Sequence, residues 1–212
     1  MTSSTDLAAL LCSRLCHDML SPVGALNNGI ELLVDEKDPE MRARCLELLE
    51  QSARVSADKL KFFRLAYGAA GGYGENVPTD EPRALVQALV GGNARVTLNW
   101  TVLEVALPKP AVKVLLNLAA IGLDALPRGG VLDVGAEMRD GATEIVIRAA
   151  GPKVTFDEGI GQALDGRIAE EALSTRTAPA YMIRLLAEEL GGGLQFALTE
   201  DALVMGAVLP QG

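Results

Sequence analysis

The sequence predicts an α+β chain in two parts, a helical hairpin over residues 1–70 and an α/β sandwich over residues 71–212. Apolar residues recur at spacings of three and four throughout the first part, which is typical of amphipathic helices. The second part alternates β-branched runs with apolar helical stretches. Between them, residues 68–82 are rich in glycine and turn formers, so we expect a linker or a long loop there.

The first predicted helix begins near Thr5 or Asp6, either of which can cap it, and it runs to about Val34. Pro22 lies inside this helix and cannot donate to the carbonyl group of Asp18, so it should bend the helix. At roughly 100° per residue, one arc of about 140° collects the apolar residues and forms the expected packing face. This arc contains Leu7, Leu11, Leu15, Met19, Pro22, Leu26, Ile30 and Leu33.

An acidic turn over residues 35–39 leads into a second predicted helix, which starts at Pro39 and ends near Tyr67 and Gly68. Two long helices joined by a short turn form an antiparallel hairpin. Such a hairpin cannot bury both apolar stripes by itself. We therefore expect two copies to pair as a homodimer with a dimeric four-helix bundle.

The second part predicts strands packed against one layer of helices, which is an α/β sandwich. Its strongest local signal is Asp140-Gly141, a dipeptide typical of a tight hairpin turn. The expected elements are a short helix over 83–90, one or two strands over 95–107, a helix over 111–126, strands over 131–139 and 142–150, an irregular stretch with some helix over 151–177, a helix over 180–190, and a final hairpin over 194–198 and 203–209.

The composition excludes several classes of function. A formal net charge of -9, without a cluster of Lys and Arg, argues against binding of nucleic acid. The first residues lack the basic flank and apolar core of a secretory signal, and no run is long enough for a membrane span. We therefore expect a cytoplasmic protein that makes no membrane contact.

The three cysteines, Cys12, Cys16 and Cys45, fall on predicted helices and are odd in number. Reduced thiols that act as small hydrophobic side chains are the expected state. Cys16 and His17 project about 100° apart on the helix, and the chain contains no further histidine that could complete a metal site. We expect no metal to be bound by this chain.

His17 is the only histidine in the chain, and it projects beyond the edge of the packing face. An exposed imidazole is mostly neutral near pH 7, and its Nε2 lone pair can attack phosphorus. A neighbouring carboxylate that accepts a hydrogen bond from Nδ1 would fix the tautomer and leave Nε2 free. Asp18 is the candidate for this orienting role.

The stretch His17-Asp18-Met19-Leu20-Ser21-Pro22, on the first helix of a dimerising hairpin, resembles the phosphoacceptor motif of sensor histidine kinases. The second part resembles the ATP-binding domain of the same kinases. Residues 114–118, followed by 127–130, are similar to the asparagine-box helix and its exit, and residues 186–194 resemble the helix that ends the glycine-rich lid.

The sequence departs from that family where the nucleotide would bind. The position of the magnesium-binding asparagine is Ile121, and residues 149–153 lack the aspartate and the last glycine of the adenine-binding stretch. Residues 176–180 stand where the glycine-rich lid should be, and they contain no glycine that could cradle phosphates. Autophosphorylation from ATP should therefore be absent, and we expect no bound cofactor.

An intact histidine on a kinase-like body with a degenerate nucleotide site resembles the ChpT-type histidine phosphotransferases of alphaproteobacteria. That resemblance implies that His17 takes a phosphoryl group from a receiver domain of a hybrid histidine kinase and passes it to receiver domains of response regulators. The partner receiver would supply the aspartate, the lysine and the magnesium ion. The expected receiver-binding face consists of Ser13, Arg14, Leu20, Ser21, Gly24 and Asn28.

Two other functions remain open at this point. The first is a sensor histidine kinase or nucleotide-binding ATPase with a divergent ATP site, which measurable ATP binding would support. The second is a non-catalytic dimeric adaptor that binds receiver domains without accepting phosphate. An adaptor would keep its function in His17→Ala, whereas a phosphotransferase would lose phosphoryl transfer.

Overall fold

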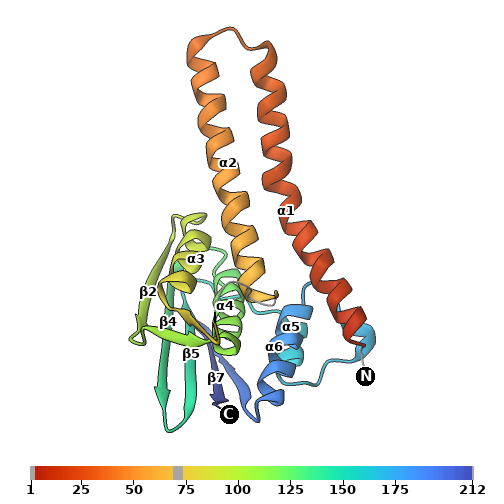
Figure 1. Ribbon diagram of the computed structural model, residues 1–212, viewed down its shortest axis with the longest axis vertical. Helices are drawn as coiled ribbons and strands as arrows, with labels where there is room; N and C mark the ends of the chain where they lie inside the picture. Colours follow the sequence, from red (N-terminus) through yellow and green to blue (C-terminus); the bar gives the residue numbers. More distant parts are fainter. Residues whose placement is uncertain (1–2, 69–73, 212) are drawn as a thin grey trace.

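A computed structural model describes residues 3–68 and 74–211 of the chain. Figure 1 shows a long helical hairpin that rises from a broader α/β part. The hairpin consists of α1, Ser4–Asp35, and α2, Pro39–Ala66. Pro39 opens α2 as predicted, and Asp38 caps it by accepting a hydrogen bond from the backbone N–H of Glu40.

The predicted cap of α1 at Thr5 or Asp6 is wrong. The helix begins at Ser4, and its cap is Ser3, two residues before Thr5; the Ser3 hydroxyl accepts from the Asp6 N–H at 3.1 Å. A serine hydroxyl three residues before an amide is well placed for this bond. The Asp6 side chain accepts from the same hydroxyl, so Asp6 supports the cap from inside the first turn.

The predicted packing face of α1 is largely confirmed. Its residues are buried or half-buried, with the exception of Ile30, which is 55% exposed. The C-terminal part of α1, which contains Ile30, extends beyond the α/β part and has only α2 beside it (Figure 1). Within one copy of the chain, a single neighbouring helix cannot cover that end of the stripe.

The predicted linker over 68–82 is wrong for its second half; its residues 69–73 lie outside the described residues. The strand β1, Asn76–Pro78, pairs antiparallel with β3, Ala106–Pro108, and the helix α3 begins at Asp80. Val77 in β1 and its ladder partner Leu107 are both fully buried. A single buried valine between turn formers gives too weak a pattern to predict this strand.

The five-stranded sheet has the order β2-β4-β5-β7-β6. β2 and β4 are parallel, and the other neighbouring pairs are antiparallel. Asp140 and Gly141 both have positive φ, 49° and 77°, which confirms the tight turn between β4 and β5. The strands are β2, Val96–Val102; β4, Gly130–Arg139; β5, Ala142–Ala150; β6, Gly193–Leu198; and β7, Ala202–Pro210.

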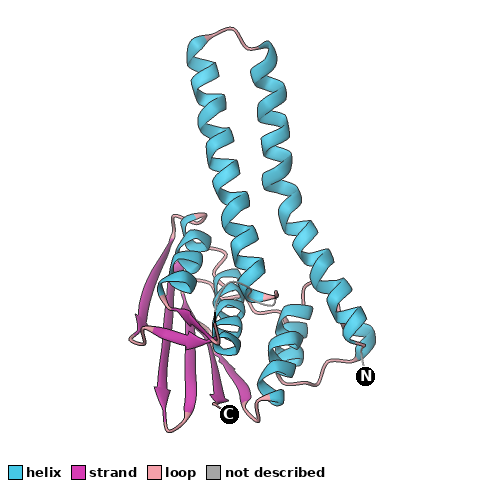
Figure 2. Ribbon diagram, viewed as in Figure 1, coloured by secondary structure: helices cyan, strands magenta, loops and turns pink. Residues whose placement is uncertain are grey.

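The helices of the second part pack against one face of this sheet, as Figure 2 shows. The predicted sandwich is thereby confirmed, including the mostly irregular stretch over 151–177, which holds one short helix and one 3₁₀ turn. The helices are α3, Asp80–Gly91; α4, Lys109–Asp124; α5, Glu158–Leu164; and α6, Ala178–Glu189, with the 3₁₀ turn at Glu170–Ala172.

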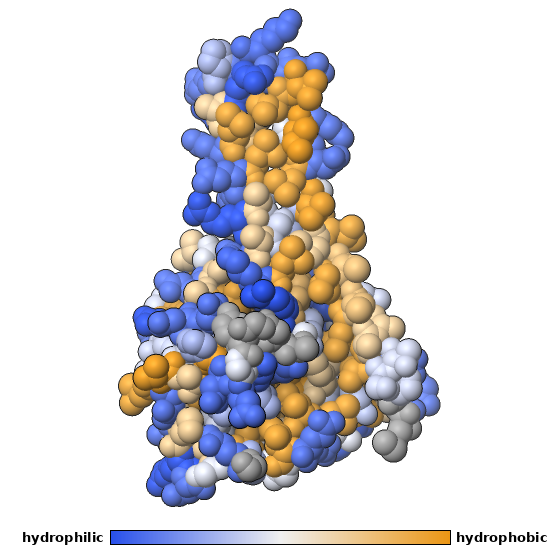
Figure 3. All heavy atoms as spheres, in the orientation of Figure 1, coloured by the Kyte–Doolittle hydropathy of each residue, from blue (hydrophilic) through white to orange (hydrophobic). Residues whose placement is uncertain are grey.

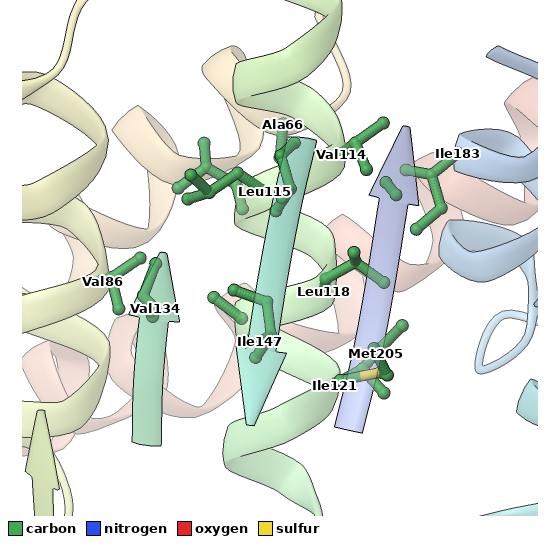
Figure 4. Close-up of a cluster of buried hydrophobic side chains, with 14 of the residues drawn as sticks. Ala66, Val86, Val114, Leu115, Leu118, Ile121, Val134, Ile147, Ile183 and Met205 are labelled. Carbon is green, nitrogen blue, oxygen red and sulfur yellow. The ribbon is translucent and has the colours of Figure 1, made fainter. Parts of the chain in front are cut away.

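The base of the hairpin belongs to the same hydrophobic core as the sandwich. Figure 4 shows Ala66 of α2 beside Leu115 of α4, with the side chains of the sheet below them. Phe62, Phe63 and Ala66 are at most 5% exposed and form one cluster with the residues of α3, α4 and the strands. The buried Asn117 of α4 also donates to the Ala66 carbonyl oxygen at 3.4 Å. The sandwich therefore fixes the C-terminal end of α2.

Leu107→Ala tests this core, with Leu103→Ala as its matched control. Leu107 is fully buried, whereas Leu103, four residues earlier, is 89% exposed. We expect Leu107→Ala to lower the free energy of unfolding by about 2–5 kcal/mol and Leu103→Ala to change it by less than about 0.5 kcal/mol. Urea unfolding followed by circular dichroism measures both values. Equal effects of the two substitutions would contradict the burial of Leu107.

Candidate functional site

His17 points to solvent from the middle of α1. Its side chain is 81% exposed. Leu15 and Met19, two residues before and after it, pack against the core. The histidine therefore lies outside the packing face, as the helical projection predicts, and another protein can reach its imidazole.

Asp18 holds the imidazole from the side that faces the protein. Its Oδ1 lies 3.1 Å from His17 Nδ1. Burial alone would raise the pKa of Asp18, but hydrogen bonds from Arg14 and His17 and the charges of Arg14 and Lys59 outweigh it and lower that pKa. An ionised carboxylate only accepts hydrogen bonds, so this contact favours the tautomer of His17 that carries its proton on Nδ1 and leaves the Nε2 lone pair free.

Arg14 is the one predicted docking residue that turns inward. Its side chain is 27% exposed, and its Nε donates to Asp18 Oδ2 at 2.6 Å. Its Nη2 lies 3.9 Å from Oδ2 of Asp124, at the end of α4. Because Asp124 is 69% exposed, this second contact is weak compared with the first. Arg14 therefore fixes Asp18 and is only partly exposed, which differs from the exposed side chain that the helical projection predicts; its contact with receivers stays a prediction.

Tyr67 closes the inner side of this group of charged residues. Burial raises the pKa of Tyr67 to about 12, with smaller effects from the charges of Arg14, Asp18 and Asp124. Its ring stacks on Phe63, with 5.5 Å between the ring centroids. A phenol with this pKa stays protonated at neutral pH, so its part here is packing rather than proton transfer.

Lys59 of α2 is a site residue that sequence reasoning missed. Its Nζ donates to the backbone carbonyl oxygen of Asp18 at 2.8 Å, across 41 positions of the chain. The available signal was Pro22, which has no N–H and leaves that carbonyl without its usual helical donor. The sequence shows that a donor is needed, but it does not show which residue of α2 supplies it.

The remaining predicted docking residues lie on α1, on the same side of the helix as His17. Leu20, the large apolar member of this face, is 71% exposed. At Gly24, an added Cβ would meet nothing within 4 Å, so the backbone is open to close approach. The exposed polar members are Ser13, Ser21 and Asn28.

The region where a kinase would bind ATP has residues unsuited to it. Ile121, at the place of the magnesium-binding asparagine, is 8% exposed and belongs to the core. A cavity of about 250 Å³ lies beside it, and two carboxylates, Asp124 and Asp157, face this cavity. Arg176, which also lines it, pairs with Asp157 at 3.3 Å. This arrangement disfavours a polyphosphate and offers no amide ligand for its magnesium ion.

The described residues contain neither a metal-binding cluster nor a membrane-spanning helix. Within residues 3–68 and 74–211, no group of three or more His, Cys, Asp or Glu side chains could hold a metal ion. No helix in the same residues is long and apolar enough to cross a membrane.

Comparison with known proteins agrees with this geometry. Residues 79–202 match the family of the histidine phosphotransferase C-terminal domain. The protein phosphotransferase ChpT of Brucella abortus (strain 2308) is 37% identical over 205 residues, which cover 97% of this chain and 96% of that protein.

Solved structures extend the similarity. A bacterial phosphotransferase superimposes with a TM-score of 0.83 at 36% identity, and the match covers 98% of both chains. The histidine kinase domain of a blue-light activated kinase from Erythrobacter litoralis matches 90% of this chain and 94% of its own, with a TM-score of 0.52 at 12% identity, and shows the shared fold alone. On the family match and the 37% identical relative, this chain belongs to the ChpT-type histidine phosphotransferases.

Proposed function

We propose that His17 is the phosphoacceptor through which this histidine phosphotransferase acts in its phosphorelay. It would receive the phosphoryl group from the receiver-domain aspartate of a hybrid histidine kinase and deliver it to receiver domains of response regulators. The observation that carries the proposal is an imidazole that is 81% exposed and hydrogen-bonded through Nδ1 to Asp18. Exposure admits a partner's active site, and the hydrogen bond keeps Nε2 unprotonated for attack.

Transfer to His17 follows an in-line displacement. The Nε2 lone pair attacks phosphorus while the bond between phosphorus and the receiver's aspartate oxygen breaks, and the aspartate leaves as a carboxylate. The ring gains positive charge as the nitrogen–phosphorus bond forms, and Asp18 stabilises it through the Nδ1 proton. The reverse sequence at a second receiver breaks the nitrogen–phosphorus bond. Magnesium and a lysine come from the receiver.

We propose that receivers dock on Ser13, Leu20, Ser21, Gly24 and Asn28. These residues lie along the same side of α1 as His17, and Leu20 offers a large exposed apolar side chain at the centre of the face. Arg14 contributes indirectly: its partly buried guanidinium donates to Asp18 and so holds the residue that orients His17.

We propose that the transferase works without autokinase activity. The supporting observations are the buried Ile121 in place of a magnesium ligand and the two carboxylates that line the remaining cavity. Phosphate would then reach His17 only from another protein.

We also propose that the chain acts as a homodimer. Met41, Leu48 and Val55 recur every seven residues on α2 and are 43%, 59% and 40% exposed; Val23 and Ile30 repeat the same spacing on α1. Figure 3 shows apolar surface along the hairpin. An apolar groove of about 450 Å³ between the lower ends of α1 and α2 continues this surface. Pairing with a second hairpin would bury all of it.

His17→Ala tests the relay. Wild-type protein incubated with a labelled, phosphorylated receiver domain should gain acid-labile label, whereas His17→Ala should gain none. Because the His17 side chain is mostly exposed, the substitution should leave the free energy of unfolding within about 0.5 kcal/mol of wild type. Labelled ATP with magnesium should label neither protein. Equal labelling of wild type and His17→Ala by the receiver would contradict the role of His17 as phosphoacceptor. Signalling that persists in His17→Ala would contradict it as well, because it would indicate an adaptor.

Arg14→Met tests the support of Asp18, with the exposed pair of Arg44 and Glu40 as the matched control. We expect Arg14→Met to lower the free energy of unfolding by about 1–2 kcal/mol at pH 7 and Arg44→Met to lower it by at most about 0.5 kcal/mol. The pKa of Asp18 is lowered on folding from an ordinary value of 3.8, so this stabilisation is present above that pH and is lost as the pH falls through the lowered value.

The difference in free energy of unfolding between wild type and Arg14→Met should therefore become smaller as the pH falls below about 4. Urea unfolding between pH 7 and pH 3 measures it for both variants. A deficit that is the same at both ends of this range would show that Arg14 stabilises the protein by packing rather than through the Asp18 carboxylate.

The dimer is tested by sedimentation. Wild type at micromolar concentration should sediment at twice its chain mass of 22.3 kDa. Leu48→Glu with Val55→Glu, which places two charges in the exposed stripe of α2, should shift the protein to monomer, whereas His17→Ala should not. A stable wild-type monomer would refute the dimer.

A further inference from the structure

Pro22, one turn after His17, leaves a backbone carbonyl of α1 without its helical hydrogen-bond donor. It lies within α1, which continues from Ser4 to Asp35, and it is buried. In a regular helix the N–H of residue 22 would donate to the carbonyl of residue 18. Proline has no N–H, so the Asp18 carbonyl loses this donor, and a proline inside a helix favours a bend at this point.

Lys59 of the neighbouring helix supplies the missing donor. Its Nζ lies 2.8 Å from the Asp18 carbonyl oxygen, and its side chain is half-buried between the two helices. A carbonyl in such a place needs a hydrogen-bond partner, and an ammonium group is a strong one. The Lys59 charge also acts on the Asp18 carboxylate. Asp18 is therefore held at its backbone by Lys59, at its side chain by Arg14, and in contact with His17.

We propose that Lys59 is a positioning residue for phosphotransfer. By donating to the Asp18 carbonyl that Pro22 leaves without a helical donor, it fixes the bend of α1 and the direction in which Asp18 orients His17. This inference rests on the proposed role of His17 as phosphoacceptor. Pro22 and Lys59 act as one unit, because the proline makes the lysine necessary.

A double-mutant cycle between Lys59→Met and Pro22→Ala tests this unit. We expect Lys59→Met to slow transfer at saturating phosphorylated receiver by about 10- to 100-fold, because small misplacements of a nucleophile have effects of this size. Half-saturation by the receiver should change little, since Lys59 lies below the docking face. Pro22→Ala restores an N–H at position 22. In that background, Lys59→Met should slow transfer less than about threefold.

The matched control is Lys61→Met. Lys61 lies two residues along the same helix, where its Nζ is 3.7 Å from Asp58 and its side chain is 61% exposed. Its loss should leave the transfer rate within about twofold of wild type. Lys59→Arg, which keeps a cationic donor, should retain more of the rate than Lys59→Met does.

A spectroscopic signature separates positioning from general loss of stability. His17 is the only histidine, so the ¹⁵N shifts of its two ring nitrogens are unambiguous. Wild type should show the proton on Nδ1. Lys59→Met should shift the tautomer population of His17 towards the Nε2–H form that free side chains prefer. Lys59→Met with Pro22→Ala should restore the Nδ1–H form.

The outcomes separate the two proposals. If wild type takes no label from any phosphorylated receiver, the proposed function fails, while the tautomer measurement still decides whether Lys59 positions His17. If Lys59→Met transfers at the wild-type rate with an unchanged tautomer, the role of Lys59 is overturned and the relay stands. Should Lys59→Met not fold, Lys59→Met with Pro22→Ala decides: failure of that double variant to fold or to transfer would also overturn the inference.

Discussion

The hydrogen bond between His17 Nδ1 and Asp18 is the contact that the rest of the site serves. A phosphoacceptor that meets other proteins' active sites has to be exposed, and exposure leaves an imidazole free to turn and to exchange tautomers. In this structure, neighbouring residues meet the two requirements. His17 is 81% exposed and accessible, whereas Asp18 is 23% exposed and orients the imidazole. Asp18 can orient its neighbour because Arg14 and Lys59 hold it from two different directions. The residues that hold Asp18 therefore lie on the inner side of His17, and the outer side of the imidazole stays open to a partner.

The sandwich contributes to this order through its core. Phe63 and Ala66 of α2 are buried with the residues of α4, and Asn117 donates to the Ala66 carbonyl oxygen. The residue that resembles the first asparagine of a kinase nucleotide site therefore fastens the hairpin to the sandwich. Four residues later, one turn along the same helix, Ile121 fills core space. The helix that would bind magnesium in a kinase serves here as a packing element.

Local chemistry made much of the fold predictable. Asp140-Gly141 predicted a turn whose two residues do have positive φ, and the apolar spacing of α1 predicted the side on which His17 lies. The strand β1 could not be predicted in the same way, because its stability comes from Val77 meeting Leu107, thirty positions away. The inward turn of Arg14 was missed for a similar reason. A helical projection places a side chain at an angle, but it does not show which other element lies opposite.

A fixed sandwich suits transfer between proteins better than transfer from a bound nucleotide. A chain that phosphorylated its own histidine would have to bring the nucleotide's phosphorus to within bonding distance of Nε2 and then withdraw to admit a receiver. Here a withdrawal would expose Phe63 and Ala66 and break the bond from Asn117, so it would cost free energy at every cycle. A relay needs no such motion, because each partner brings its own aspartate and metal ion. The buried Ile121 and the shared core therefore both fit the proposed relay, in which the phosphoryl group comes from another protein and a constant surface around His17 can meet each receiver in turn.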